Sequence, residues 1–173
     1  MTDGSGLADV YGATISRIKA QDGDKSRLGM AVLMWISHAE RPLKADELCH
    51  ALAVELGSTD FDSRNVPSIS TLVGCCQGLI VVDKEASTVR LVHFTLQEYI
   101  SAHPDLLSGS HSTMAEICLT YLNSQQIKAP LTYPSLDAQN TPFLEYLNSP
   151  FDLSLRERFL VRDTPFLEYC SVY

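Results

Sequence analysis

One short stretch, residues 89–100, most constrains the fold, because it predicts a strand that runs directly into a helix. Its first part alternates apolar side chains between two faces, as a strand does. In its second part, Thr95 precedes Glu98 by three residues, which is the spacing of a capping box at a helix N-terminus. The sequence therefore places His93 at the end of a strand and beside the start of a helix.

This placement of His93 suits contact with a phosphate. The first turn of a helix presents free N–H groups and the positive end of the helix dipole, and both attract anions. The alternative is a partly buried structural histidine, which is the common situation at the end of a strand in a small domain. From the residues around His93 alone, the structural interpretation is the favoured one.

Helical periodicity dominates the chain before this stretch. Apolar residues recur at helical spacing in four segments: 7–18, 24–36, 43–56 and 68–79. The second segment is apolar most of the way round, so we expect it to be the central core helix. Asp24 and Ser68 are the expected N-caps of the second and fourth helices.

Two short strands are predicted next, 79–83 and 89–93, joined by the loop 84–88 as a β-hairpin. Three helices, a hairpin and a further helix follow one another in the order of a winged helix, with the hairpin as its wing. The expected fold class is therefore mainly α with a small β-hairpin: a winged helix followed by the start of a helical segment.

We expect three regions along the chain. Residues 1–23 form an N-terminal amphipathic helix, residues 24–104 the winged-helix domain, and residues 105–173 a truncated helical extension with a polar linker. The block Thr-Pro-Phe-Leu-Glu-Tyr occurs at 141–146 and returns unchanged at 164–169. Each copy should begin a helix, with Thr as cap and Pro at the first helical position.

The composition of the chain bears on its cellular compartment and on the partners that it can bind. The chain has 173 residues and a formal net charge of −8, so its surface has the wrong sign for phosphate backbones. Its five cysteines form an odd, scattered set, which favours reduced thiols in the cytoplasm over a disulfide framework. The longest apolar run, residues 30–36, is too short to span a bilayer, and no signal peptide is expected.

The winged-helix prediction raises the possibility of DNA binding, which the charges disfavour. Groove-reading helices carry Arg, Lys, Asn or Gln on their outer face. The corresponding segment here, 68–79, contains no Lys or Arg, and the outer positions expected for it include Cys75. The wing offers Lys84 beside Glu85. We therefore expect no nucleic-acid partner.

No catalytic or metal-binding motif is present in the sequence. The patterns GxxxxGK[ST], HExxH, CxxC and GxSxG are all missing. The five histidines are dispersed, and the acidic side chains of the helices, Glu47 among them, are expected on solvated faces. The sequence predicts a non-enzymatic chain that binds no cofactor or metal by itself.

The segment His-Phe-Thr-Leu-Gln-Glu-Tyr, residues 93–99, resembles the His-x-Ser-Phe-Gln-Glu-Tyr/Phe signature of the winged-helix domain that follows a NACHT ATPase module. Residues 6–11, 37–43 and 47–48 also resemble this region of fungal NOD-like (STAND-class) proteins, many of which carry ankyrin repeats. The region is similar as well to the winged-helix domain of GPI inositol-deacylase. That likeness implies no deacylase activity, because the nucleophile elbow is missing.

The NACHT resemblance implies a regulatory, cytoplasmic signalling role. In that family the histidine reaches the bound ADP and helps to hold the protein in its inactive state, so His93 is the candidate nucleotide-sensing residue. The partner would be a NACHT module, in cis or in trans, and ADP or ATP would belong to the intact protein. Two alternatives remain: a free-standing protein-interaction module or truncated product, and, less favoured, a winged-helix nucleic-acid binder.

Overall fold

The computed structural model describes residues 4–124 and 165–172. The first copy of the duplicated block, 141–146, lies outside the described residues. Two 3-10 turns, Ser63–Asn65 and Pro104–Leu107, accompany the regular elements. These elements are, in chain order, α1 (Gly4–Lys19), α2 (Asp24–His38), β1 (Leu43–Lys44), α3 (Ala45–Ala53), α4 (Ile69–Cys75), β2 (Ile80–Asp83), β3 (Thr88–Leu91), α5 (Phe94–Ala102), α6 (Ser110–Asn123) and α10 (Pro165–Val172).

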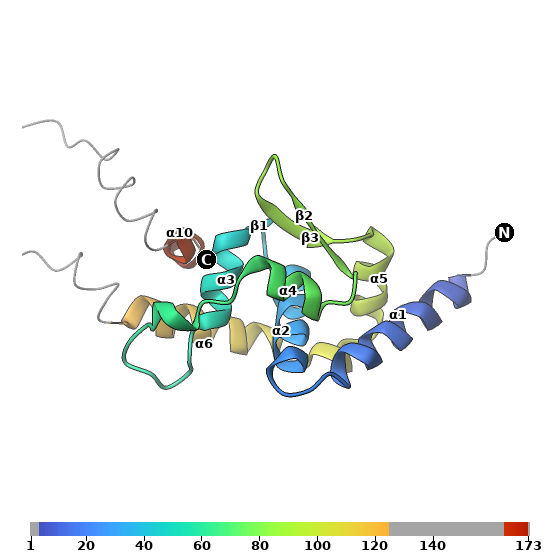
Figure 1. The fold of residues 1–173 in the computed structure, drawn as a ribbon, viewed down its shortest axis with the longest axis horizontal. Coiled ribbons are helices and arrows are strands. Elements are labelled where there is room, and N and C mark those ends of the chain that lie inside the picture. The colour runs from blue at the N-terminus through green and yellow to red at the C-terminus, as the bar shows by residue number, and fades with distance from the viewer. Residues whose placement is uncertain (1–3, 125–164, 173) are drawn as a thin grey trace, which may run out of the picture.

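Helix α2 is the centre of the molecule, as its sequence predicts (Figure 1). Val32 and Trp35 are fully buried, and α1, α3, α4 and α6 all pack against this helix. Gly29 allows the closest approach. A Cβ atom at this position would lie 2.7 Å from Ile18 Cγ2 and 2.8 Å from the Cys75 carbonyl oxygen. The missing side chain therefore lets α1 and the end of α4 pack directly on the backbone of α2.

The strands form a three-stranded antiparallel sheet in the order β1-β3-β2. The hairpin of β2 and β3 is the predicted wing, with Ile80 opposite Leu91 and Asp83 opposite Thr88. The carboxylate of Asp83 accepts hydrogen bonds from the backbone N–H groups of Glu85 and Ala86, at 3.0 and 3.1 Å, and so closes the turn.

Strand β1 is absent from the sequence prediction, which placed residues 43–56 in one helix. Leu43 instead pairs with Val89 of β3, and the helix starts at Ala45. The carboxylate of Glu47 accepts a hydrogen bond from the Lys44 backbone N–H at 2.8 Å, which caps the first turn. The predicted cap at Asp24 is also wrong, because Gly23 occupies that position and Asp24 is the first helical residue. The Ser68 cap of α4 is confirmed.

Two predicted helix faces are corrected. Cys75, expected on the outer face of α4, is buried, because this side of the helix rests on Gly29. Leu7 and Val10, expected to pack inward from α1, are 42% and 57% exposed. Only the C-terminal part of α1 lies on the core, while its N-terminal part extends beyond α5 (Figure 1).

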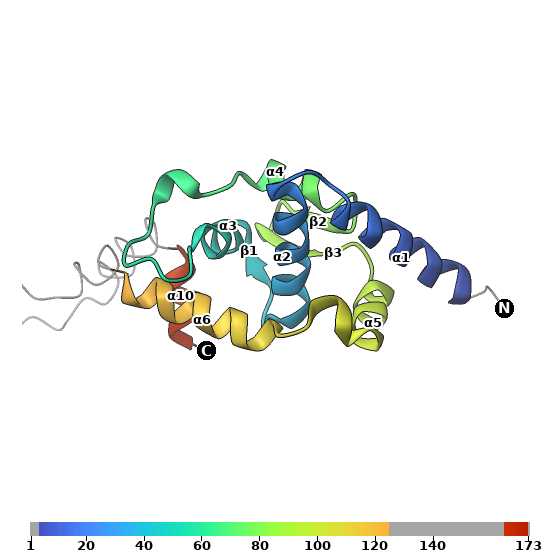
Figure 2. The same cartoon turned by 90° about the horizontal axis from the view of Figure 1, so that it is seen from below.

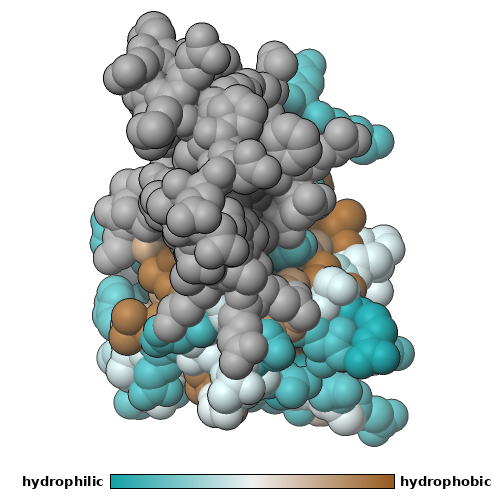
Figure 3. Space-filling model, turned by 90° about the vertical axis from the view of Figure 1, so that its left-hand side faces the viewer, coloured by the Kyte–Doolittle hydropathy of each residue, from teal (hydrophilic) through white to brown (hydrophobic). Residues whose placement is uncertain are grey.

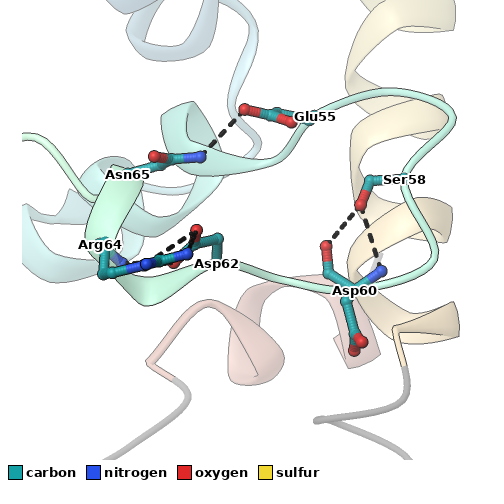
Figure 4. A network of polar contacts seen from close by, with 6 residues as sticks. All are labelled: Glu55, Ser58, Asp60, Asp62, Arg64 and Asn65. Carbon is teal, nitrogen blue, oxygen red and sulfur yellow. Dashed lines mark hydrogen bonds and ion pairs between the residues drawn. The ribbon is translucent and has the colours of Figure 1, made fainter.

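The loop between α3 and α4 is fastened by its own polar contacts (Figure 4). The Asn65 side-chain amide donates to Glu55 Oε1 at 2.9 Å, and Arg64 Nη2 pairs with Asp62 Oδ2 at 2.8 Å. The second pair is highly exposed, so solvent screens it and it contributes little to stability.

Helices α6 and α10 share the core of the winged helix (Figure 2). Tyr121 of α6 and Phe166 of α10 are both fully buried. The ring of Phe166 contacts Trp35 of α2 edge-on, at a centroid distance of 5.4 Å. The winged-helix domain is predicted to end at residue 104, but described residues after this position pack in the same core. The helix predicted for the second copy of the duplicated block is confirmed and begins at Pro165.

Candidate functional site

The candidate site is built on the junction between β3 and α5, where His93 is the N-cap residue of the helix. Its backbone is extended, with φ −152° and ψ 148°, and its Nδ1 accepts a hydrogen bond from the Thr95 backbone N–H at 3.3 Å. The strand-to-helix transition at His93 is thus confirmed. The capping box predicted from Thr95 and Glu98 is wrong, because α5 starts at Phe94 and Thr95 already lies in its first turn.

The shift has a local physical reason. The imidazole of His93 supplies the acceptor that a Ser or Thr side chain supplies at most N-caps. The helix therefore begins before Thr95, and Glu98 is an exposed residue of the next turn. His93 itself is exposed, so the interpretation of it as a partly buried structural residue does not describe the molecule.

A short chain of hydrogen bonds connects His93 to α1. Thr95 Oγ1 lies 2.9 Å from His93 Nδ1 and 2.8 Å from the hydroxyl oxygen of Tyr11. Because Nδ1 accepts from the Thr95 N–H, the neutral ring carries its proton on Nε2. In this tautomer the Nε2–H group is a donor that has no partner among the described residues, on a histidine that is exposed.

Aromatic packing positions this hydrogen-bond chain. The rings of Tyr11 and Tyr99 lie 5.8 Å apart, and Tyr99 packs on His103 at 4.3 Å. A Cβ atom at Gly12 would come within 3.0 Å of the Tyr99 hydroxyl, so α1 and α5 approach closely there. Tyr11 is not among the residues that the sequence predicts for the site, because its only signal there is a place on the apolar face of α1.

Apolar side chains flank His93, and these three consecutive residues, Val92, His93 and Phe94, are called the exposed corner below. Val92 and Phe94 flank the histidine and are 40% and 67% exposed. On α1, Leu7 and Val10 are also exposed, whereas Tyr11, which contacts Thr95, is buried. Val92 and Phe94 are two of the six exposed large hydrophobic residues in the described part of the chain. Exposed apolar side chains on both sides of an exposed histidine suit a surface that a partner covers.

A second polar group, Arg41 with Glu47, lies in the segment that follows the C-terminal end of α2 and at the start of α3. Glu47 has no exposed side-chain area, which corrects the expectation of a solvated face. Its carboxylate binds the Arg41 guanidinium through two contacts, at 2.7 and 2.8 Å, and the guanidinium lies 5.2 Å from the centroid of the Tyr169 ring. These three residues, Arg41, Glu47 and Tyr169, are called the buried corner. The bidentate ion pair joins the segment before β1 to α3, and the cation–π contact joins the same segment to α10.

The remaining histidines are less dispersed than the sequence suggests. His38 and His111 meet edge to face at a centroid distance of 5.1 Å. His50 stacks on Phe61 at 5.2 Å, and its burial lowers its pKa below 6.5. Within residues 4–124 and 165–172, no three His, Cys, Asp or Glu side chains are grouped as a metal site would need.

The surface of α4 has the composition that the sequence predicts. Its exposed positions include Ser70, Thr71 and Gly74, none of which carries a charge. On the side of the molecule near α3 and α10, visible hydrophobic residues form small patches among hydrophilic ones (Figure 3). No helix among the described residues is long and apolar enough to cross a bilayer.

The helices α2, α3 and α4, which pack on one another, together with a three-stranded sheet and an exposed wing, define a winged-helix protein. The family model of the GPI inositol-deacylase winged helix domain matches residues 17–117, which is more than half of the chain. The chain therefore belongs to this family, and the resemblance stated from the sequence is confirmed to that extent. Comparisons with curated proteins and with solved structures found no match.

Proposed function

We propose that this chain is a non-catalytic regulatory winged-helix segment of a NACHT (STAND) receptor-like protein. In the intact protein it packs on the ADP-bound NACHT core, and His93 contacts the nucleotide. The chain alone binds no cofactor, acts in the cytoplasm and takes no nucleic-acid partner. Membership of the winged-helix family supports the fold part of this proposal. The resemblance of residues 93–99 to the NACHT-associated signature and the exposure of His93 support the contact with a nucleotide-bound partner.

The observation that carries the proposal is the pair of exposed apolar residues that flank the exposed His93. Val92 and Phe94 form an apolar rim, and the Nε2 atom of His93 has no partner among the described residues. A protein partner that covers the rim would exclude water from the histidine, and a hydrogen bond in a dry interface is stronger than one in water. An anion held by that partner is the natural acceptor for the Nε2–H group.

This arrangement functions as a two-state device. The bond from His93 to a phosphate exists only when the winged helix is docked, so it stabilises the docked state alone. A hydrogen bond to a charged phosphate is worth about 1.5–3 kcal/mol, which changes a docked-to-free ratio by about 10- to 150-fold. Nucleotide exchange that removes the acceptor would release the domain.

The test uses the chain joined to a NACHT module with an intact phosphate loop. His93→Ala should accelerate ADP release by about 10- to 100-fold in a stopped-flow assay with fluorescent ADP. His93→Asn is the matched variant, because asparagine retains N-cap ability but lacks the imidazole. Both variants should release ADP faster, whereas only His93→Ala should weaken the start of α5.

Val89→Ala is the control for general instability, since Val89 is buried in β3 and its truncation lowers stability without touching the exposed corner. Unchanged ADP release in both His93 variants would overturn the nucleotide role. Saturable Mg-ADP binding by the isolated chain below about 100 μM would contradict the dependence on a NACHT module.

The second candidate is a free-standing protein-interaction module, which the same apolar rim also favours. The two functions differ in what covers the rim. Phe94→Asp should abolish docking on the NACHT module if the first proposal is correct. If it leaves ADP release unchanged in the joined protein, the rim belongs to another protein partner.

A further inference from the structure

Helix α10 is fastened to the core by aromatic side chains. Phe166 and Tyr169 are buried, and both rings contact Trp35. The Phe166 ring also meets Tyr121 of α6 at a centroid distance of 5.1 Å, where the two helices cross (Figure 2). The sides of α6 and α10 that carry Tyr121 and Phe166 therefore face each other.

A pair of cysteines lies beside this ring contact. Cys118 is one turn before Tyr121 on α6, and Cys170 is one turn after Phe166 on α10, so each shares a side of its helix with a contacting ring. The two thiols are close enough for each to be the main influence on the pKa of the other. Both cysteines are free in this structure.

The pair is chemically unequal. The interaction between the two thiols lowers the pKa of Cys118 and raises that of Cys170, and Cys118 is also the more exposed of the two. Burial instead raises the pKa of Cys49 to about 11 and that of Cys76 to about 12. Cys118 is only half-buried, which gives a small oxidant access to its sulfur.

We propose that Cys118 and Cys170 form a reversible, peroxide-driven disulfide that fastens α10 to α6. This modification site is independent of the NACHT proposal. It would make attachment of the C-terminal helix sensitive to the redox state of the compartment.

The chemistry follows from the order of reactivity. The Cys118 thiolate attacks one oxygen of hydrogen peroxide, the O–O bond breaks, and the departing hydroxide takes up a proton as water. The resulting sulfenic acid is then attacked by the Cys170 sulfur, which breaks the S–O bond and releases a second water. Two thiols and one peroxide give one disulfide and two waters, and a dithiol reductant reverses the oxidation.

The disulfide would matter because α10 is short. A helix of eight residues is not stable alone, so α10 depends on its packing. A covalent bond to α6 removes the freedom of the unfolded chain between positions 118 and 170. Oxidation should therefore stabilise the folded chain.

The experiment treats the purified full chain with stoichiometric hydrogen peroxide. We expect an intact mass lower by two hydrogens, a proteolytic peptide pair joined through Cys118 and Cys170, and a melting temperature raised by about 5 °C or more. Dithiothreitol should reverse all three changes. Cys118→Ala and Cys118→Ser should each remove the cross-link and the thermal shift, with circular dichroism reporting their folding.

Cys75→Ser is the control, because this buried cysteine lies on α4 and should leave the cross-link intact. The proposal is overturned if Cys118 proceeds to sulfinic acid without a disulfide, or if the cross-link joins two chains. A correct cross-link that leaves the melting temperature unchanged would equally overturn the fastening role.

Discussion

The two polar corners of this molecule treat their functional groups in opposite ways. At the buried corner, Glu47 has no exposed side-chain area and its carboxylate is bound by Arg41 and by the Lys44 backbone. At the exposed corner, the imidazole of His93 is engaged on one nitrogen and open on the other. Both lie in stretches that resemble the same protein family.

The difference separates a structural motif from a recognition motif. A charge that is fully paired inside the protein can hold elements together but has no capacity for a further ligand. An exposed group held in one tautomer and orientation stabilises little, yet it is ready for a partner. Two motifs that are equally recognisable in the sequence can thus have different roles. The burial of Glu47 and the exposure of His93 distinguish them.

The largest expected effect is at the buried corner. Glu47→Ala leaves the Arg41 guanidinium without its carboxylate and the Lys44 N–H without its acceptor, so we expect a loss of about 3–5 kcal/mol in the free energy of unfolding. Urea denaturation measures it. The matched control is Asp62→Asn, which breaks the exposed pair with Arg64 and should cause no measurable loss. Equal losses in both variants would erase the distinction between buried and exposed charges.

An intermediate effect is expected from His50, one turn after Glu47 on α3. Burial lowers the pKa of His50 in the folded protein below 6.5, so the unfolded chain binds the proton more readily. Stability from this residue is therefore present above pH 6.5 and is lost as the pH falls through the lowered pKa. His50→Phe retains an aromatic contact with Phe61 and should flatten the stability profile below pH 6.5. An unchanged acid slope would assign the loss to other groups.

The smallest effect is at the exposed corner. In the isolated chain, His93→Ala removes only a cap acceptor, so the free energy of unfolding should fall by about 1 kcal/mol or less. Thermal denaturation with His93→Asn in parallel should show still less. A loss as large as that of Glu47→Ala would mean that His93 is a structural residue, and the comparison between the corners would fail.

Much of the fold is predictable because local patterns agree with it. The central helix α2 and the wing follow from apolar periodicity, whereas the helix start after His93 is predicted from a capping box that the structure does not contain. The exceptions depend on distant contacts. β1 is only two residues long and exists because Leu43 meets Val89 of β3, which no local pattern reveals.

The candidate site shows the same limit. The position of His93 follows from the sequence, but its capping role does not, because histidine seldom replaces Ser or Thr there. The contact of Thr95 with Tyr11 joins residues 84 positions apart. Glu47 resembles any exposed helical acid until Arg41 and Tyr169 are placed beside it.

The close approach at Gly29 has a consequence for how this chain can vary. Every other amino acid would place a Cβ atom against the Cys75 carbonyl, whereas a Cβ atom at Gly74, on the open side of α4, would meet nothing within 4 Å. The two glycines therefore differ in mutational tolerance although both are helical. In a library that samples all substitutions, position 29 would stay nearly invariant and position 74 would accept alanine, so the constraint on α2 would be visible in sequence counts alone.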